Sequence, residues 1–249
     1  MNTIKQLLLL VAVYLCGAFM AYTPVTNPPP SLAPFLPLAM SGGIGVRSVT
    51  VNPLDFGWLP QAKESTVMVQ TPTGHGSGVC IGRKGGHALV LTALHVVREF
   101  QIGDELLTLR WASGNVDFQL TAYVALKSEV DDLALVEGLD THGFLHSRQL
   151  GADSPDPGLL VLAIGYPADV YPASVTVGFS RGIDFDDETP YLLHSANLWF
   201  GNSGGPLFND KGWVVGINVM IGGYNGHVAS DRCLSVPIER ILIFLQGRI

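Results

Sequence analysis

The most informative stretch of this chain is GNSGGPL, from Gly201 to Leu207. Two shorter stretches precede it, TALHVV at Thr92 to Val97 and DDLAL at Asp131 to Leu135. In chain order the three stretches supply the imidazole of His95, the carboxylate of Asp131 or Asp132, and the hydroxyl of Ser203. A serine hydroxyl is a weak nucleophile near pH 7, so it needs a base and a group that holds that base in one tautomer. The three stretches therefore predict nucleophilic catalysis by Ser203.

The glycines around Ser203 suit that chemistry. Glycine lets the chain turn tightly and aim backbone N–H groups at one point in space. Such amides stabilise the oxyanion of a tetrahedral intermediate, and we expect the donors to be those of Gly201 and Ser203. Taken alone, the motif also fits an ordinary turn, because glycine, asparagine and serine are common turn residues. Its occurrence downstream of His95 and Asp132 favours the catalytic interpretation.

The order histidine, aspartate, serine resembles that of the chymotrypsin/trypsin-like clan of serine peptidases. Within it the HtrA/DegP-like branch is the closer match, because GSGV (Gly76 to Val79) precedes the histidine and GIN (Gly216 to Asn218) follows the serine. The resemblance covers roughly residues 65–240. Subtilisin-like and α/β-hydrolase triads run in other chain orders, and the hydrolase elbow needs Gly-x-Ser-x-Gly.

Carried over residue by residue, the resemblance implies that His95 is the general base, Asp132 its orienting carboxylate and Ser203 the nucleophile. The neighbouring Asp131 is the alternative to Asp132. We prefer Asp132 because in the family the acid directly precedes Leu-Ala. The resemblance also implies which positions line the substrate pocket. None of them is acidic, and no histidine stands where relatives that cleave after glutamate carry one, which predicts small apolar side chains at the cleaved position. The matching pocket positions are Asn197, Leu198, Asn218, Val219 and Ile221.

The pattern from Ser65 onward predicts an all-β fold. Short β-branched or alternating runs bounded by glycine indicate strands. Six fall in a first series, at 66–71, 79–82, 87–94, 106–111, 118–127 and 133–136, and six in a second, at 159–164, 174–180, 191–195, 206–209, 213–219 and 233–236. The repeated count predicts two six-stranded antiparallel β-barrels of the chymotrypsin-like kind. Helical spacing after Pro237 predicts a short C-terminal helix.

The domain organisation follows from the same scan. Residues 61–249 form the protease-like domain, with a first barrel at about 61–140 and a second at about 155–240. Residues 138–157, rich in turn formers, are the expected connection between the barrels. Too few residues follow the last strand for a PDZ module, so we expect none. The proline- and glycine-rich residues 23–60 predict an extended arm without helix or central strand.

The N-terminal segment, residues 1–22, indicates export. Lys5 precedes sixteen uncharged residues from Leu7 to Tyr22, which is typical of a signal peptide or a short signal anchor. A secreted or periplasmic protein and a membrane-anchored one both fit. The choice between a cleaved signal and a retained anchor stays open, as does the oligomeric state.

Composition excludes several partners. The chain has 21 acidic and 14 basic residues, a net charge of −7 and no basic cluster. Nucleic acid is therefore not expected as a partner, because binding phosphates requires cations. No cluster of His and Cys ligands suggests a metal site, and we expect no cofactor. Cys80 and Cys233 are expected to be buried thiols rather than a bridge, although the bridge stays possible.

Three functions remain open at this point. The first is an endopeptidase that cleaves proteins or peptides through an acyl-enzyme. The second is a pseudoprotease that keeps the fold as a binding scaffold, which fits poorly with three filled catalytic positions. The third is an esterase with the same triad, because acyl transfer alone does not distinguish amides from esters.

Overall fold

The computed structural model describes residues 56–247 except 106, 170, 187 and 225–226, and it describes only the backbone at 169 and at the other positions from 220 to 231. The predicted N-terminal segment (1–22) and most of the predicted arm lie outside the described residues. The remaining chain holds twelve strands and four short helical segments. No helix within residues 56–247, as described, has the length and apolar content to cross a bilayer.

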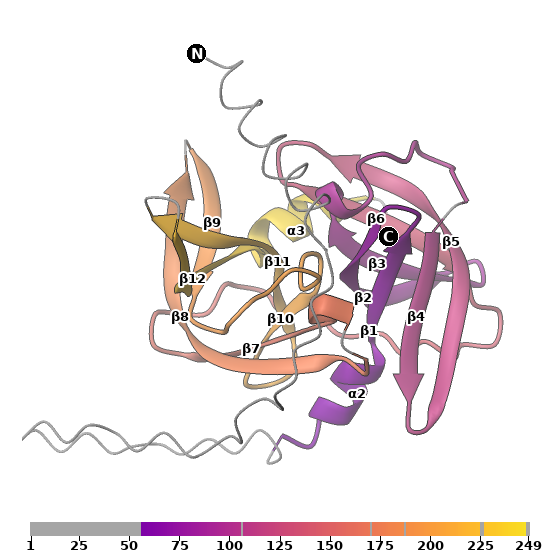
Figure 1. Cartoon of the computed structure of the whole chain (residues 1–249), viewed down its shortest axis with the longest axis horizontal. Helices are drawn as coiled ribbons and strands as arrows, with labels where there is room; N and C mark the ends of the chain where they lie inside the picture. The colour runs from indigo at the N-terminus through magenta and orange to yellow at the C-terminus, as the bar shows by residue number, and fades with distance from the viewer. Residues whose placement is uncertain (1–55, 106, 170, 187, 225–226, 248–249) are drawn as a thin grey trace, which may run out of the picture. The chain divides into compact units, whose positions relative to one another are not determined.

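The first barrel comprises the strands drawn in purple to magenta in Figure 1. They are β1 (Thr66–Thr71), β2 (Gly74–Lys84), β3 (His87–Ala93), β4 (Leu107–Ser113), β5 (Val116–Ser128) and β6 (Leu133–Leu139). All neighbours are antiparallel, in the order β1-β2-β3-β6-β5-β4, and pairing of β1 with β4 closes the barrel.

The second barrel repeats this plan six strands later. It comprises β7 (Leu160–Gly165), β8 (Ser174–Asp186), β9 (Thr189–His194), β10 (Pro206–Asn209), β11 (Val214–Tyr224) and β12 (His227–Pro237). Its strand order, β7-β8-β9-β12-β11-β10, is that of the first barrel with six added to each number. The predicted fold of two six-stranded antiparallel barrels is confirmed.

Two helices flank the barrels. The C-terminal helix α3 (Ile238–Leu245) begins directly after Pro237, as predicted. The helix α2 (Leu59–Glu64) corrects the prediction that residues 23–60 hold no helix. Pro60 lies in the first turn of α2, where its missing N–H would have no intrahelical partner and its fixed φ suits the helix. Two short 3₁₀ turns, η2 (Leu94–Val96) and η3 (Pro167–Asp169), follow β3 and β7.

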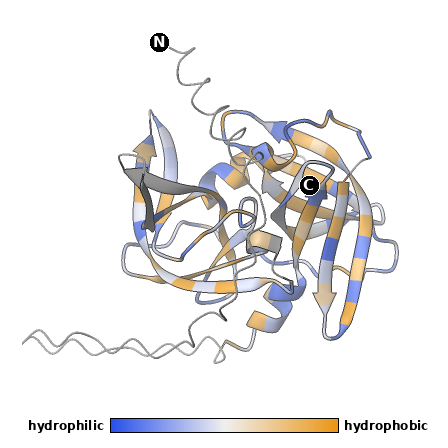
Figure 2. Cartoon of the chain, in the orientation of Figure 1, coloured by the Kyte–Doolittle hydropathy of each residue, from blue (hydrophilic) through white to orange (hydrophobic). Residues whose placement is uncertain are grey.

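Alternation along the strands places the cores. In β4 the side chains alternate between buried and half-buried, and Figure 2 shows the corresponding change of colour along the ribbons. The interior of the first barrel is filled by Val67, Val69, Val90, Leu109, Trp111 and Val124. A separate cluster packs inside the second barrel, around Val161, Leu192, Leu207 and Val215.

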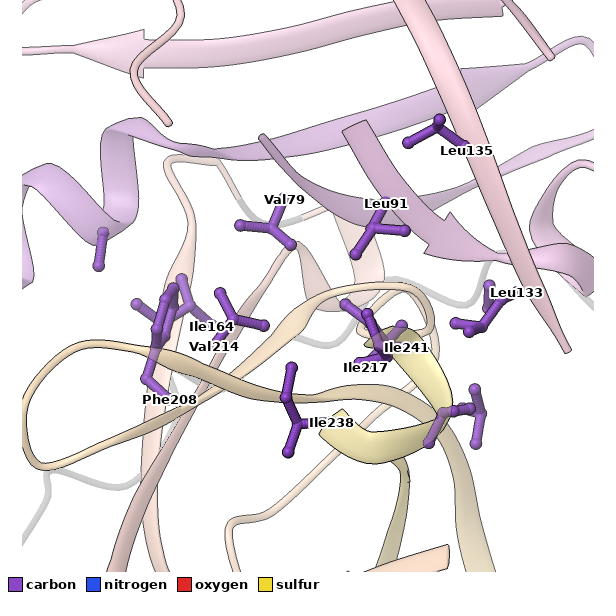
Figure 3. Close-up of a cluster of buried hydrophobic side chains, with 14 of the residues drawn as sticks. Val79, Leu91, Leu133, Leu135, Ile164, Phe208, Val214, Ile217, Ile238 and Ile241 are labelled. Carbon is purple, nitrogen blue, oxygen red and sulfur yellow. The ribbon is translucent and has the colours of Figure 1, made fainter. Parts of the chain in front are cut away.

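A third apolar cluster joins the two barrels. Figure 3 shows Val79, Leu91, Leu133 and Leu135 of the first barrel facing Ile164, Phe208 and Ile217 of the second, with Ile238 and Ile241 of α3 beside them. Burial of apolar surface is the main favourable term in association of structural units. This cluster fixes the barrels against each other and so fixes the distance between residues carried on different barrels.

Several strands are longer than predicted. β2 begins at Gly74, not near Val79, and its glycine-rich start pairs with β1 through Thr71. Glycine has low strand propensity, so the sequence pattern predicts a loop at residues 74–78. Cys80 and Cys233 are buried thiols in different barrels, and no bridge joins these two described residues.

Candidate active site

His95 and Asp132 contact each other at the end of the first barrel. His95 lies in η2, immediately after β3, and Asp132 immediately precedes β6. The Asp132 Oδ2 atom is 2.6 Å from the His95 Nδ1, and Oδ1 accepts a hydrogen bond of 2.9 Å from the His95 backbone N–H. The histidine is therefore held through its ring and its backbone by one carboxylate.

This contact fixes the tautomer of the neutral histidine. A carboxylate accepts hydrogen bonds, so the proton of a neutral ring lies on Nδ1 and the lone pair on Nε2. The side chain of His95 is 36% exposed and that of Asp132 is 24% exposed. In that tautomer the Nε2 lone pair can accept a proton.

The backbone at Asp132 is strained. Asp132 has a φ of 51°, which is uncommon for a residue other than glycine, and its carbonyl accepts from the Leu94 N–H at 2.9 Å. Strained residues are often found at functional sites, where surrounding contacts hold them in place. Here those contacts come from Leu94 and His95 on the facing turn.

Asp131 has a different environment from Asp132. Its side chain is 9% exposed and accepts from the Ser128 hydroxyl at 2.8 Å. Arg240, from α3, donates from Nε to its Oδ1 at 2.6 Å. The structure brings Asp132 to His95, and it pairs Asp131 with the C-terminal helix. Arg240 was not singled out in the sequence, because nothing in a local pattern indicates a partner more than a hundred residues away.

The nucleophile loop, defined as residues 200–205, lies next to η2, the turn that carries His95 and is called the histidine turn below. Gly76 separates the two: a Cβ added to Gly76 would lie 2.5 Å from Val96 Cγ2 and 2.9 Å from the Ser203 carbonyl oxygen. Only glycine fits so close an approach. No hydrogen bond joins the Ser203 hydroxyl to His95 among the described residues. Catalytic hydrogen bonds are often long without substrate.

Three amides of the nucleophile loop are bonded to backbone carbonyls. Asn202, Gly204 and Gly205 donate to the carbonyls of Trp199, Asn218 and Asn202 at 2.9, 2.7 and 2.9 Å. Within the described part of the chain, the amides of Gly201 and Ser203 donate no hydrogen bond. These two are the donors predicted from the sequence.

The Phe200–Gly201 peptide has a defined orientation. The Ala168 N–H donates to the Phe200 carbonyl at 2.8 Å. In a trans peptide the carbonyl and the following N–H point in opposite directions, so the Gly201 N–H points away from Ala168. Gly201 has a φ of 96°, a left-handed conformation that glycine adopts readily and other residues rarely adopt.

The five predicted pocket residues lie after β9 and along β11. Asn197 is exposed, whereas Leu198 and Val219 are each 8% exposed. Asn218 is fully buried, and its amide donates to the Pro206 carbonyl at 3.2 Å. Ile221 pairs with Cys233 through the backbone, and its side chain lies outside the described part.

A series of hydrogen bonds between buried side chains connects Asn218 with His194 through Ser235. The Ser235 hydroxyl donates to Asn218 Oδ1 at 2.9 Å, so the Ser235 oxygen accepts from His194 Nε2 at 3.0 Å. Burial lowers the pKa of His194 from 6.5 to about 4, which keeps the ring neutral. Asn218 in turn bonds the backbone of Gly204 and Gly205. His194 ends β9, and no local pattern in the sequence indicates this chain of hydrogen bonds.

No group of three or more His, Cys, Asp or Glu side chains converges within the described residues.

The fold and the site together define a class. Two closed antiparallel six-stranded barrels carry a paired histidine and aspartate on the first and a glycine-flanked serine on the second, as in chymotrypsin-like peptidases. The trypsin-like peptidase domain family matches residues 76–217, more than half of the chain. The chain therefore belongs to the trypsin-like peptidase domain family.

Relatives within the family are of the HtrA/DegP type. A probable periplasmic serine endoprotease DegP-like of Ectopseudomonas mendocina is 35% identical over 66% of this chain and 33% of that protein. The serine protease Do-like HtrA of Bacillus subtilis is 30% identical over 60% of this chain and 34% of that protein. This chain thus spans about a third of the length of these curated relatives.

A solved structure agrees with the fold. The apo MamO protease domain of Magnetospirillum magneticum is 26% identical, with a TM-score of 0.60. The match covers 75% of this chain and 98% of that domain.

Proposed function

We propose that the protein is a serine endopeptidase that hydrolyses proteins or peptides. The observation that carries this proposal is the two-point contact of Asp132 with His95, which orients the ring and leaves Nε2 basic. The position of Ser203 across Gly76 from the histidine turn supports the same assignment.

The reaction follows from these roles. As the Ser203 Oγ attacks the scissile carbonyl carbon, His95 Nε2 takes the hydroxyl proton and Asp132 stabilises the resulting imidazolium. The tetrahedral intermediate collapses when Nε2 returns that proton to the leaving amine, which leaves an acyl-enzyme. Water, deprotonated by the same Nε2, then hydrolyses the ester and restores Ser203.

The proposed oxyanion donors are the amides of Gly201 and Ser203. The amides of Asn202, Gly204 and Gly205 are bonded to backbone carbonyls, whereas these two amides have no partner among the described residues. Loss of one such donor typically reduces kcat by a factor of about 10²–10³.

For specificity, we propose a small apolar side chain at the cleaved position. Leu198 and Val219 supply apolar surface, and Asn197 adds an uncharged polar group. Cleavage-site profiling with a peptide library tests this, and dominance of Arg, Lys or Glu at that position would contradict it.

For location, we propose that the protein is exported, either secreted or periplasmic, or anchored in the membrane through residues 1–22. The uncharged segment after Lys5 and the name of the DegP-like relative, a probable periplasmic endoprotease, support this. Detection of the chain in the periplasmic, membrane or cytoplasmic fraction tests it, and a purely cytoplasmic protein would contradict export.

Labelling with a fluorophosphonate tests the enzyme proposal. We expect a covalent adduct on Ser203 in the wild type and none in Ser203→Ala. Equal labelling of both, or none of either, would instead favour the pseudoprotease scaffold. Comparison of casein cleavage with turnover of a simple ester separates the endopeptidase from the esterase.

A further inference from the structure

Ser77 joins the two barrels at the nucleophile loop. It lies in β2 and is completely buried. Its hydroxyl donates to the Gly201 carbonyl at 2.6 Å and accepts from the Tyr166 N–H at 2.9 Å. Its own N–H donates to the Ser203 carbonyl at 2.7 Å. One residue of the first barrel therefore binds the carbonyls of the two residues whose amides are the proposed oxyanion donors.

We propose that Ser77 is a positioning residue that holds the nucleophile loop in the geometry required for oxyanion stabilisation. This rests on the proposed function for its effect on rate. Residue 201 is glycine, the residue type with the greatest backbone freedom, at a position where the direction of one N–H matters.

Two hydrogen bonds restrict that freedom. The Phe200 carbonyl, held by Ala168, fixes the peptide plane before the Gly201 Cα. The Gly201 carbonyl, held by the Ser77 hydroxyl, fixes the plane after it. Because peptide groups are planar, fixing both planes fixes φ and ψ of Gly201, and with them the direction of its N–H.

The surroundings of Ser77 leave little room for other side chains. A Cβ added to Gly165 would lie 2.9 Å from the Ser77 Oγ, and one added to Gly205 would lie 3.1 Å from the Ser77 Cβ. The site is therefore packed around a small hydroxyl. Ser77→Ala is the informative change, since it removes the oxygen and adds no atoms.

Ser180 supplies a matched control. It is 2% exposed, its hydroxyl donates to the Pro155 carbonyl at 2.7 Å, and it accepts from the Gly182 N–H at 3.2 Å. Ser180→Ala thus removes the same pattern of one donated and one accepted bond, on β8 and outside the nucleophile loop.

The first test is steady-state hydrolysis of a peptide substrate. We expect Ser77→Ala to lower kcat by about 10- to 100-fold with KM changed by less than about threefold, because the oxyanion forms only in the transition state. Ser180→Ala is expected to keep the wild-type kcat. Equal kcat values for Ser77→Ala and Ser180→Ala would overturn the proposal.

The second test does not depend on activity. In a Ser203→Ala background, amide hydrogen exchange is measured in peptides covering residues 199–205. Faster exchange with Ser77→Ala, but not with Ser180→Ala, supports the positioning role, and equal exchange overturns it. A wild type that neither hydrolyses peptides nor reacts with a fluorophosphonate would overturn the proposed function, while the exchange result would still decide whether Ser77 holds the loop.

Discussion

Burial of His194 makes the stability of the fold depend on pH. The ring is completely inaccessible, and its Nε2 is bound to Ser235. We expect replacement by glutamine, His194→Gln, to remove the titrating group while keeping a polar side chain. The experiment uses the Ser203→Ala background so that self-cleavage does not interfere.

The pKa values of His194 determine the direction and the size of the change in the free energy of unfolding with pH. The pKa of His194 is about 4 in the folded protein and 6.5 as the ordinary value. Between these values the unfolded chain binds more protons than the folded chain, so stability falls as pH drops from 6.5 towards 4. For this shift, the contribution of His194 to the free energy of unfolding falls by about 2 kcal/mol between pH 7 and pH 4.5.

Urea unfolding at pH 7 and pH 4.5 measures this contribution. Other groups titrate over the same range, so the informative quantity is the difference between the parent and His194→Gln. We expect the parent to lose about 2 kcal/mol more than the variant. His146→Gln, at an exposed position, is expected to behave as the parent. Equal losses for the parent and His194→Gln would show that His194 does not cause the pH dependence.

Three further predictions concern the side chain of Arg240, the backbone of Gly201 and the thiol of Cys80. Arg240→Met leaves a buried carboxylate unpaired and should lower the free energy of unfolding by about 2 kcal/mol in urea titrations, whereas Arg232→Met, which breaks an exposed pair, should change it by less than about 0.5 kcal/mol. Gly201→Ala should lower kcat by at least about 100-fold, while Gly114→Ala, also at positive φ but in open space, should leave kcat unchanged. Burial raises the pKa of Cys80 to about 11, so at pH 8 mass spectrometry should show alkylation about 100-fold slower than for an exposed thiol, with urea restoring reactivity.

Much of the fold could be predicted from local patterns. Strand alternation depends on neighbouring residues, and the two sets of six strands follow from it. The errors lie where local preference and tertiary pairing disagree. Residues 74–78 are mostly glycine yet belong to β2, because β1 supplies hydrogen bonds to them. The proline-rich pattern that includes Pro60 predicts no helix, although the first turn of α2 accommodates this proline.

The candidate site also has a part that local patterns predict and a part that they do not. The predicted residues His95 and Asp132 come together, and their catalytic roles, like that of Ser203, remain proposals. The network around them was not predictable. Ser77 lies within the GSGV motif, but the motif does not say that its hydroxyl reaches Gly201, 124 residues away. Likewise, nothing local indicates that Arg240 binds Asp131.

Residue types and short spacings are enough to establish the strand pattern, the order of the histidine, aspartate and serine, and the glycine-rich surroundings of Ser203. Three further features depend on tertiary contacts: which aspartate meets His95, which amides of the nucleophile loop keep no partner among the described residues, and which buried side chains bond to that loop. His95 meets Asp132 through the pairing of β3 with β6 inside the first barrel, whereas Ser77 reaches the nucleophile loop because the two barrels pack against each other, as Figure 3 shows for their apolar contact. No local spacing encodes either arrangement.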